Sequence, residues 1–133
     1  MRGIVLADTG PLYAARDPDD THHDRAHDEL AHLRAQNLKV VVPYPILLES
    51  YSLVMRKLGN RPAHALLAEV TSTSILTNAT TGDYQDASVT ILPYRNQDLT
   101  LFDTVLAAMS ARLGAPVWTF DHHFDVMRVN VWR

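Results

Sequence analysis

The chain has 133 residues, 47% of them hydrophobic, so it can bury one real core and is not expected to be disordered. It has no cysteine, which excludes disulfides and thiolate chemistry, and it has neither an apolar run of the roughly 20 residues that span a membrane nor first residues long enough for a signal peptide. The net charge of −3 argues against nucleic-acid binding by bulk electrostatics alone, although two divalent cations would change it to +1.

Short apolar runs alternate with helical patterns along the whole chain. The apolar runs are rich in branched side chains, which is typical of parallel strands buried on both faces. In chain order, the predicted elements are a strand at 3–8, a helical turn at 12–16, a helix at 22–36, a strand at 38–42, a helix at 45–58, a helix at 62–70, a strand at 73–76, a helix at 83–92, a helix at 101–113, a strand at 116–120 and an edge strand at 129–132. The alternation predicts a single α/β domain over residues 1–133, a three-layer α/β/α sandwich with a mainly parallel sheet. The absence of cysteine is compatible with the reducing cytoplasm, where we expect the protein to lie.

Some helix ends carry capping signals of their own. Asp20 or Thr21 is predicted to cap the start of the second helix, and Asn37 is predicted to close it. Thr100 is predicted to cap a later helix, and Asp103, three residues on, resembles the second half of a capping box.

Four carboxylates are predicted to lie along one edge of the sheet. Asp8 ends the first strand, Asp121 follows a later strand, Glu49 lies one turn into the helix after the second strand, and Asp103 opens another helix. Ligands bind at the carboxyl edge of open α/β sheets. Crowded carboxylates stay ionised together only with cations between them, and hard oxygen ligands select Mg²⁺ or Mn²⁺. The pattern therefore predicts a metal site.

Each of these acids also has an ordinary structural explanation. Asp8 is also explained as a helix cap, and Asp103 as half of a capping box in a helix turn where the dipole favours an acid. Glu49 alone is explained as a solvated helix position, and Asp121 alone as a turn residue. The ordered combination favours the metal site more than any single acid does.

Seven histidines raise the alternative of a zinc site. His23 and His27 lie four residues apart on one helix, but Asp24 stands where a zinc protease has Glu, and no cysteine is available. We interpret these two as surface polar residues. His122 and His123 follow Asp121 and are interpreted as loop residues without a metal role.

Four segments, spread over essentially the whole chain, place the acids in hydrophobic frames. They are Leu6–Leu12, Leu47–Tyr51, Leu99–Thr104 and Val117–Phe124. Their order and spacing resemble the PIN domain family, most closely the VapC-type toxins of bacterial toxin–antitoxin pairs. The resemblance implies a metal-dependent endoribonuclease in which Mg²⁺ or Mn²⁺ is bound by an acidic quartet and the site is shaped by two threonines. The quartet is Asp8, Glu49, Asp103 and Asp121, and the threonines are Thr9 and Thr119.

This resemblance also implies a mechanism and partners. A metal-bound water of lowered pKa would attack the RNA phosphodiester in line, with no covalent nucleophile on the protein. Asp8 and Asp121 are expected to bind metal directly, and Glu49 and Asp103 directly or through water. The implied partners are an RNA substrate and a cognate antitoxin whose tail blocks the acidic groove, and the implied assembly is a homodimer, with no membrane association.

Several alternatives remain open at the level of sequence. The chain is also consistent with a PIN-like RNA-processing nuclease outside a toxin–antitoxin pair, or with a non-catalytic α/β binding module whose acids cap helices. A phosphatase with Asp8 as nucleophile lacks the usual second acid two residues later. The apolar face around Tyr51, Val54 and Leu58 is explained equally well by core packing and by a subunit contact.

Overall fold

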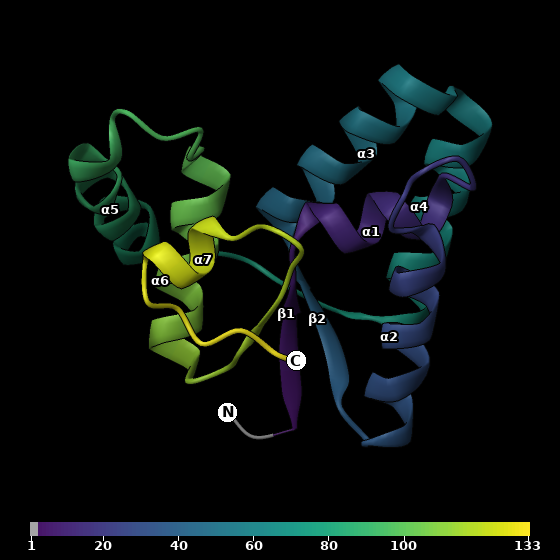
Figure 1. Cartoon of the computed structure of the whole chain (residues 1–133), viewed down its shortest axis with the longest axis horizontal. Helices are drawn as coiled ribbons and strands as arrows, with labels where there is room; N and C mark the ends of the chain where they lie inside the picture. Colours follow the sequence, from purple (N-terminus) through teal and green to yellow (C-terminus); the bar gives the residue numbers. More distant parts are fainter. Residues whose placement is uncertain (1–2) are drawn as a thin grey trace.

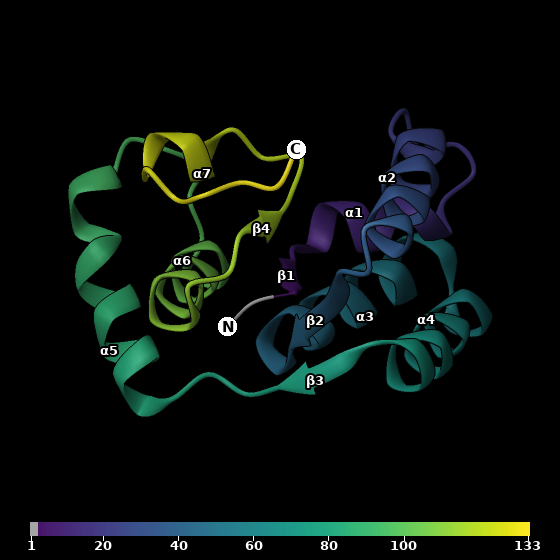
Figure 2. The ribbon, with the colours of Figure 1, turned by 90° about the horizontal axis from the view of Figure 1, so that it is seen from below.

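Four parallel strands form the centre of the molecule in the order β3-β2-β1-β4 (Figures 1 and 2). The structure is a computed structural model that describes residues 3–133. β1 (Ile4–Ala7) pairs with β2 (Lys39–Pro43) and with β4 (Val117–Trp118), and β2 also pairs with β3 (Ile75–Thr77). Because the strands are parallel, their carboxyl ends lie along one edge of the sheet.

Helices cover both faces of this sheet, as the views along and across the strands show. α5 (Thr81–Thr90) and α6 (Leu101–Leu113) lie on one side, and α1 (Thr9–Arg16), α2 (His23–Ala35) and α4 (Asn60–Thr73) lie on the other (Figure 2). The arrangement confirms the predicted three-layer α/β/α fold with a parallel sheet.

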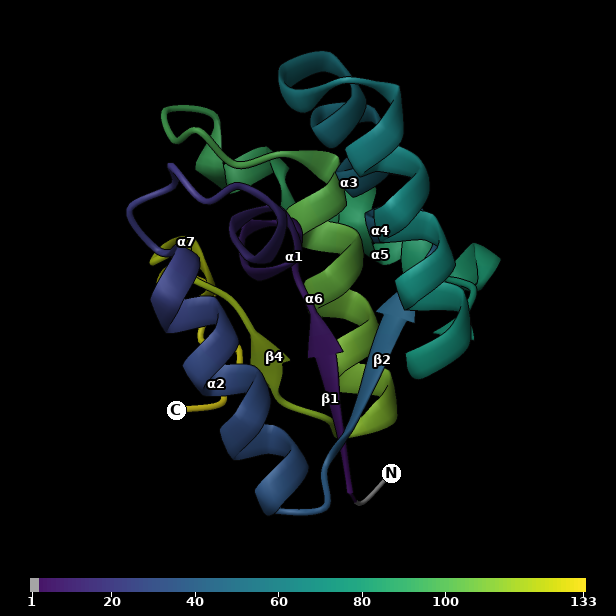
Figure 3. The same cartoon turned by 90° about the vertical axis from the view of Figure 1, so that its right-hand side faces the viewer.

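The remaining helices lie near the carboxyl edge and the C-terminus. α3 (Tyr44–Leu58) packs on α1, α4 and α6 and extends past the carboxyl ends of the strands (Figure 3). A 3₁₀ turn, η1 (Leu92–Tyr94), follows α5, and the short helix α7 (His123–Val126) follows β4. No helix in the described part of the chain is long and apolar enough to cross a membrane.

The core lies between the sheet and its two helical layers. All four residues of β1 are buried, because β1 lies inside the sheet with helices on both faces. Val54 is fully buried, and Tyr51 and Leu58 pack against the core, so core packing explains this face of α3. Trp118 is also buried, and its indole Nε1 donates a hydrogen bond to Glu29 over 2.9 Å.

Several helix boundaries differ from those predicted. α1 begins at Thr9 and not at residue 12, because the Asp8 carboxylate accepts the Thr9 backbone N–H over 2.8 Å and caps the helix. The cap predicted at Asp20 or Thr21 is wrong. The N-cap of α2 is His22, whose side chain makes no capping bond, and Asp20 instead accepts the His22 backbone N–H at 2.8 Å within a turn.

The other boundaries shift by two to three residues. α4 begins at Asn60 and α5 at Thr81, both earlier than predicted, and α5 ends at Thr90 before η1. The second helix closes with Gln36 as C-cap, and Asn37 follows in the left-handed region with φ of 57°. Asparagine is one of the few residues that adopts this conformation at low cost.

The C-terminal strands are shorter than predicted. β4 contains two residues, and the predicted edge strand at 129–132 is wrong, since the segment pairs with the sheet through the single bridge from Val131 to Val117. Beyond Trp118 the backbone N–H of Asp121 bonds to the Thr119 hydroxyl and not to a neighbouring strand, which ends regular pairing there.

Candidate functional site: an acidic pocket

All four predicted carboxylates line one cavity at the carboxyl edge of the sheet. The cavity has a volume of about 440 Å³, and we call it the acidic pocket. Two further acids also line it: Asp98, and Asp20, for which the sequence predicted only a role as a helix cap. Of the described residues, His22 is the only basic side chain in its lining. The pocket is therefore strongly negative when its acids are ionised.

Asp8 is the most deeply buried of these acids. One carboxylate oxygen, Oδ1, accepts the Thr9 backbone N–H, and the other, Oδ2, accepts the Thr119 hydroxyl over 2.7 Å. The pKa of Asp8 is raised to about 7, mainly by burial; the hydrogen bonds from Thr119 and Thr9 oppose the rise, and the charges of Asp103 and Glu49 add to it. Asp8 is thus both a helix cap and a wall of the pocket, so its two explanations are compatible.

The two predicted site-shaping threonines each contact the acids. The buried Thr119 hydroxyl donates to Asp8 and accepts the Asp121 backbone N–H over 2.9 Å, so one side chain connects the ends of β1 and β4. The Thr9 hydroxyl donates to the carboxylate of Glu49. Both threonines therefore fix the positions of carboxylates that belong to other elements.

Glu49 is partly buried and Asp103 is buried, and both have raised pKa values. Burial is the main cause for each, and the repulsion from Asp103 adds to it at Glu49, as the repulsion from Asp121 does at Asp103. Asp103 also completes the predicted capping box of α6. Its Oδ2 accepts the Thr100 backbone N–H over 3.0 Å, and its own N–H donates to the Thr100 hydroxyl over 3.2 Å.

The neighbours of Asp121 are two histidines. Its Oδ1 accepts a hydrogen bond from the backbone N–H of His123 over 2.9 Å. The same oxygen lies 2.7 Å from His123 Nδ1. His122 Nδ1 lies 3.8 Å from the same oxygen, and ligand atoms of the three residues lie within 4.8 Å of one another. Both imidazoles thus lie beside Asp121, which lines the pocket, although neither histidine lines it. His123 is the first residue of α7 and His122 its N-cap, so His123 is not the loop residue that the sequence predicted.

The other two histidines of the zinc alternative have structural partners. His23 Nδ1 lies 2.7 Å from the Ala14 carbonyl, and His27 Nε2 lies 3.0 Å from the Ala15 carbonyl. Both carbonyls belong to the last turn of α1, where a helix leaves its backbone acceptors unpaired. These side chains therefore join α2 to the end of α1.

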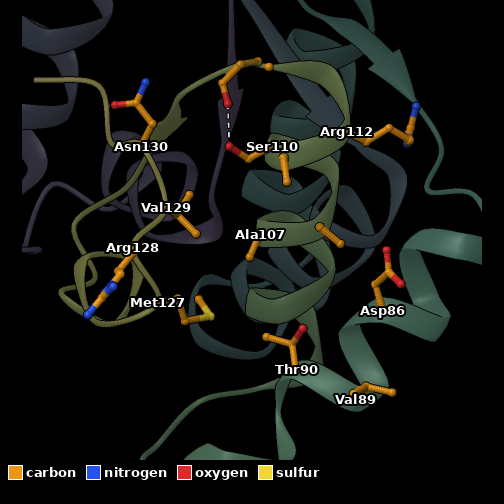
Figure 4. Close-up of a pocket in the computed structure, with 14 residues that line it drawn as sticks. Asp86, Val89, Thr90, Ala107, Ser110, Arg112, Met127, Arg128, Val129 and Asn130 are labelled. Atoms are coloured by element: carbon orange, nitrogen blue, oxygen red, sulfur yellow. Dashed lines mark hydrogen bonds between the residues drawn. The ribbon is translucent and has the colours of Figure 1, made fainter.

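A cavity larger than the acidic pocket lies elsewhere. It has about 880 Å³ and lies between α5, α6 and the C-terminal segment that contains Met127 and Asn130 (Figure 4). Small residues of α6 line it, and Ser110 within it donates to the Ala115 carbonyl over 2.6 Å. None of the six predicted site residues lines this cavity, so the predicted metal site does not lie there.

The donor set of the acidic pocket fits a hard divalent cation. Carboxylate oxygens from the end of β1, from α3 and α6, and from the turn after β4 line one space. Burial, with repulsion between the acids, raises the pKa values of Asp8, Glu49 and Asp103, so a cation in this space would favour their ionised forms. Mg²⁺ and Mn²⁺ prefer oxygen ligands of this kind.

The chain matches one family model, and its fold matches several solved structures. The model described as PIN domain matches residues 5–130. A comparison with curated proteins gives no match.

Three solved structures resemble the fold over nearly the whole length of both chains. VapC20 of Mycobacterium tuberculosis, a sarcin–ricin loop cleaving toxin, is 20% identical, with a TM-score of 0.85 and coverage of 97% of this chain and 98% of the other. VapBC2 of Rickettsia felis, bound to a DNA fragment from its promoter, is 15% identical, with a TM-score of 0.74 and coverage of 98% and 97%. FitAcB of Neisseria gonorrhoeae is 16% identical, with a TM-score of 0.67 and coverage of 97% and 96%. At these identities the likeness concerns the fold, and together with the family model it shows that the chain belongs to the PIN domain family.

Proposed function

We propose that this chain is a metal-dependent endoribonuclease that hydrolyses RNA phosphodiester bonds as the toxin of a type II toxin–antitoxin pair. The observation that carries the proposal is the convergence of Asp8, Glu49, Asp103 and Asp121 on one pocket with three raised pKa values. Membership of the PIN family and a fold like that of VapC20, a cleaving toxin, support the same activity.

The four carboxylates would bind the metal, and the threonines would orient them. Asp8 and Asp121 lie at strand ends and are connected through Thr119, which suits direct ligation. Thr9 restricts the carboxylate of Glu49, and the capping box restricts Asp103 at the start of α6. When bound, Mg²⁺ or Mn²⁺ supplies a water of lowered pKa and stabilises negative charge on the phosphate.

The same pocket provides a site for the antitoxin. An arginine-bearing tail matches a cavity lined by six acids, because guanidinium groups pair with carboxylates through charged hydrogen bonds. Occupation of the pocket by such a tail would exclude both metal and RNA. We place this pair in the cytoplasm, where the absence of cysteine is no disadvantage.

The homodimer is proposed to form through an exposed apolar stripe on α3. Tyr44, Leu48 and Met55 share one face of this helix, and their exposed fractions are 43%, 65% and 38%. Leu101 and Phe102, at the start of α6, are also exposed, and Phe102 lines the same cavity as Leu48. Exposed apolar clusters of this kind mark contact surfaces.

A titration with Mn²⁺ together with RNA cleavage tests the nuclease. Mn²⁺ is expected to raise the melting temperature of the wild type and to support RNA cleavage, and both effects should be lost in Asp8→Ala and Asp121→Ala. Asp86→Asn, at an exposed acid of α5 outside the acidic pocket, is the matched control. An Asp8→Ala protein that cuts RNA as fast as the wild type would refute the proposal.

A non-catalytic binding module is the second candidate, because Asp8 and Asp103 do cap α1 and α6. For that function, Mn²⁺ would leave the melting temperature unchanged, and RNA would stay intact. If RNA is cut but no antitoxin gene lies beside this one, an RNA-processing role outside a toxin–antitoxin pair is favoured.

A further inference from the structure

The acidic pocket by itself repels RNA. Six carboxylates line it, and an RNA strand carries one negative charge at each phosphate. Metal ions would neutralise the acids around the reacting phosphate, but the neighbouring phosphates need positive charge from the protein. The basic groups must therefore lie in a cavity that adjoins the pocket.

Such a cavity begins at Phe120 and Asp121, which line both it and the acidic pocket. It has about 220 Å³ and contains Arg25, His122, Trp132 and Arg133. We call it the Phe120 groove. The two cavities adjoin at these shared residues, so a strand that passes the acids can continue along this groove.

Arg25 is the basic group of the groove that the structure holds most firmly. Its guanidinium carbon lies 4.4 Å from the centre of the Phe120 ring, a cation–π contact, and its Nε donates to Glu29 over 3.1 Å. Its side chain is still 51% exposed. The centre of the His22 ring lies 5.0 Å from the centre of the Phe120 ring. Phe120 thus supports a cationic group at the mouth of the pocket.

The other charges of the groove are paired and exposed. Arg133 forms an ion pair with Asp125 over 2.7 Å, and the two side chains are 68% and 51% exposed. Exposed ion pairs contribute little, about 0–1 kcal/mol, so a phosphate can replace the carboxylate as partner of either arginine.

We propose that single-stranded RNA runs from the acidic pocket along the Phe120 groove, where Arg25 binds a phosphate next to the scissile one. The inference rests on the proposed nuclease function and adds a path for the substrate. Phe120 is a positioning residue, because its ring fixes the Arg25 guanidinium. A phosphate contact is independent of sequence, so Arg25 contributes affinity and not base preference.

A second cavity next to the pocket fits RNA less well. It adjoins the pocket through Thr9 and Glu49, and its lining is mostly apolar around Leu48 and Phe102, with Arg56 as its one cation among the described residues. That composition matches the protein contact proposed above.

Binding of labelled single-stranded RNA, measured by fluorescence anisotropy with Ca²⁺ in place of Mn²⁺, tests the path without requiring cleavage. Arg25→Ala is expected to weaken binding roughly tenfold for two RNAs of unrelated sequence, and to reduce the slope of log affinity against log salt by about 0.7, the value for one phosphate contact on a single strand. Phe120→Leu should give a smaller loss in the same direction. Arg34→Ala, at the far end of α2 and outside the groove, is the matched control and should bind as the wild type does.

The outcomes separate this inference from the nuclease function. Unchanged affinity and salt slope in Arg25→Ala would overturn the path, even if the wild type cuts RNA. Loss of affinity in Arg25→Ala supports the path, even if the wild type proves inactive, a result that would overturn the nuclease function alone. If Arg25→Ala leaves RNA binding intact but releases a co-purifying protein, the groove belongs to a protein partner and the RNA path is wrong.

Discussion

At the scale of single residues, the polar side chains of the pocket serve structure and chemistry together. Asp8 caps α1 and also lines the pocket, and Thr119 connects two carboxylates while it ends the pairing of β4. Burial of such groups is unfavourable unless they are hydrogen-bonded, and every buried side-chain polar atom of the described residues has a partner. The pocket is therefore fixed in shape before any cation binds.

Asp8 makes the stability of the metal-free protein depend on pH. Its pKa is about 7 in the folded state and 3.8 as a free group, so the folded state holds the proton that the unfolded chain has released. The free energy of unfolding should therefore fall as pH rises between these two values, on the order of 2–4 kcal/mol for this residue. Urea unfolding in EDTA at pH 5 and pH 8 measures the decline, which Asp8→Asn should reduce.

Asp86→Asn serves as the control, because Asp86 is exposed on α5. It should retain the full pH-dependent decline. If the free energy of unfolding of Asp8→Asn falls with pH as steeply as that of the wild type, the buried Asp8 carboxyl is not the group responsible for the fall.

Thr119 is expected to control metal affinity without binding metal. Thr119→Val keeps the shape of the side chain but removes the hydroxyl, which leaves Asp8 Oδ2 and the Asp121 N–H without this partner. Loss of a group that orients metal ligands weakens binding about 10- to 100-fold. Calorimetric titration with Mn²⁺ should show this loss in Thr119→Val and near-normal affinity in Thr119→Ser, and equal affinity of the two variants would contradict the role.

At the scale of elements, two helices begin in the same way but serve different ends. Thr80 with Asp83 caps α5, and Thr100 with Asp103 caps α6, each as a complete capping box. Asp83 is buried and pairs with Arg112 over 2.8 Å, away from the pocket, whereas Asp103 lines the pocket. One sequence pattern thus produces a structural acid in one helix and a candidate metal ligand in the other.

The two boxes allow a matched comparison. Thr80→Ala and Thr100→Ala should each lower the free energy of unfolding by about 1 kcal/mol, because each removes the hydroxyl that accepts a helix N–H. Only Thr100→Ala should also weaken Mn²⁺ binding, since only its helix carries Asp103. Urea unfolding and calorimetry measure the two effects, and an equal loss of metal affinity in both variants would show that the effect is global.

At the scale of the whole molecule, the distribution of charge matters more than the net charge of −3. Acids from four separate elements meet in one pocket, while arginines lie around its margins, as Arg25 and Arg56 do. This separation places a strongly negative site where a polyanion is proposed to react, so the proposed function predicts that RNA binding depends on metal.

Neutralising the pocket should therefore strengthen RNA binding in the absence of metal. At pH 8, above the pKa of Asp8, the double variant Asp8→Asn/Glu49→Gln removes two negative charges from the pocket and is expected to bind RNA more tightly than the wild type in EDTA. Asp86→Asn/Glu69→Gln changes the net charge equally, outside the pocket, and should have a smaller effect. Fluorescence anisotropy at one salt concentration measures the RNA affinity of each variant. Equal gains in affinity in both variants would mean that only net charge matters.

The proposed homodimer predicts a change of oligomeric state. Leu48→Glu places a charge in the exposed stripe of α3 and should convert a dimer to a monomer in size-exclusion chromatography with light scattering. Val89→Glu, at a side chain of α5 that is 68% exposed, is the control and should remain dimeric. A Leu48→Glu variant that stays dimeric would place the subunit contact elsewhere.

The sequence by itself determined the fold class and placed the four acids near the carboxyl edge of the sheet. Buried strands appear as apolar runs, helices as apolar residues at helical spacing, and acids directly after a strand lie at its carboxyl edge, so these features depend on neighbours in the chain. Strand ends were less well predicted, as β4 and the segment at 129–132 show, because pairing depends on which distant backbone groups are available.

Only the tertiary structure decided which side chains meet. The Thr119 bond between Asp8 and Asp121, the contact of His23 with the end of α1, and the stacking of Arg25 on Phe120 all join residues from different elements. No periodicity marks such pairs, since their distances are set by how helices pack on the sheet. Local patterns thus supply the chemical groups, and packing alone brings them within hydrogen-bonding distance.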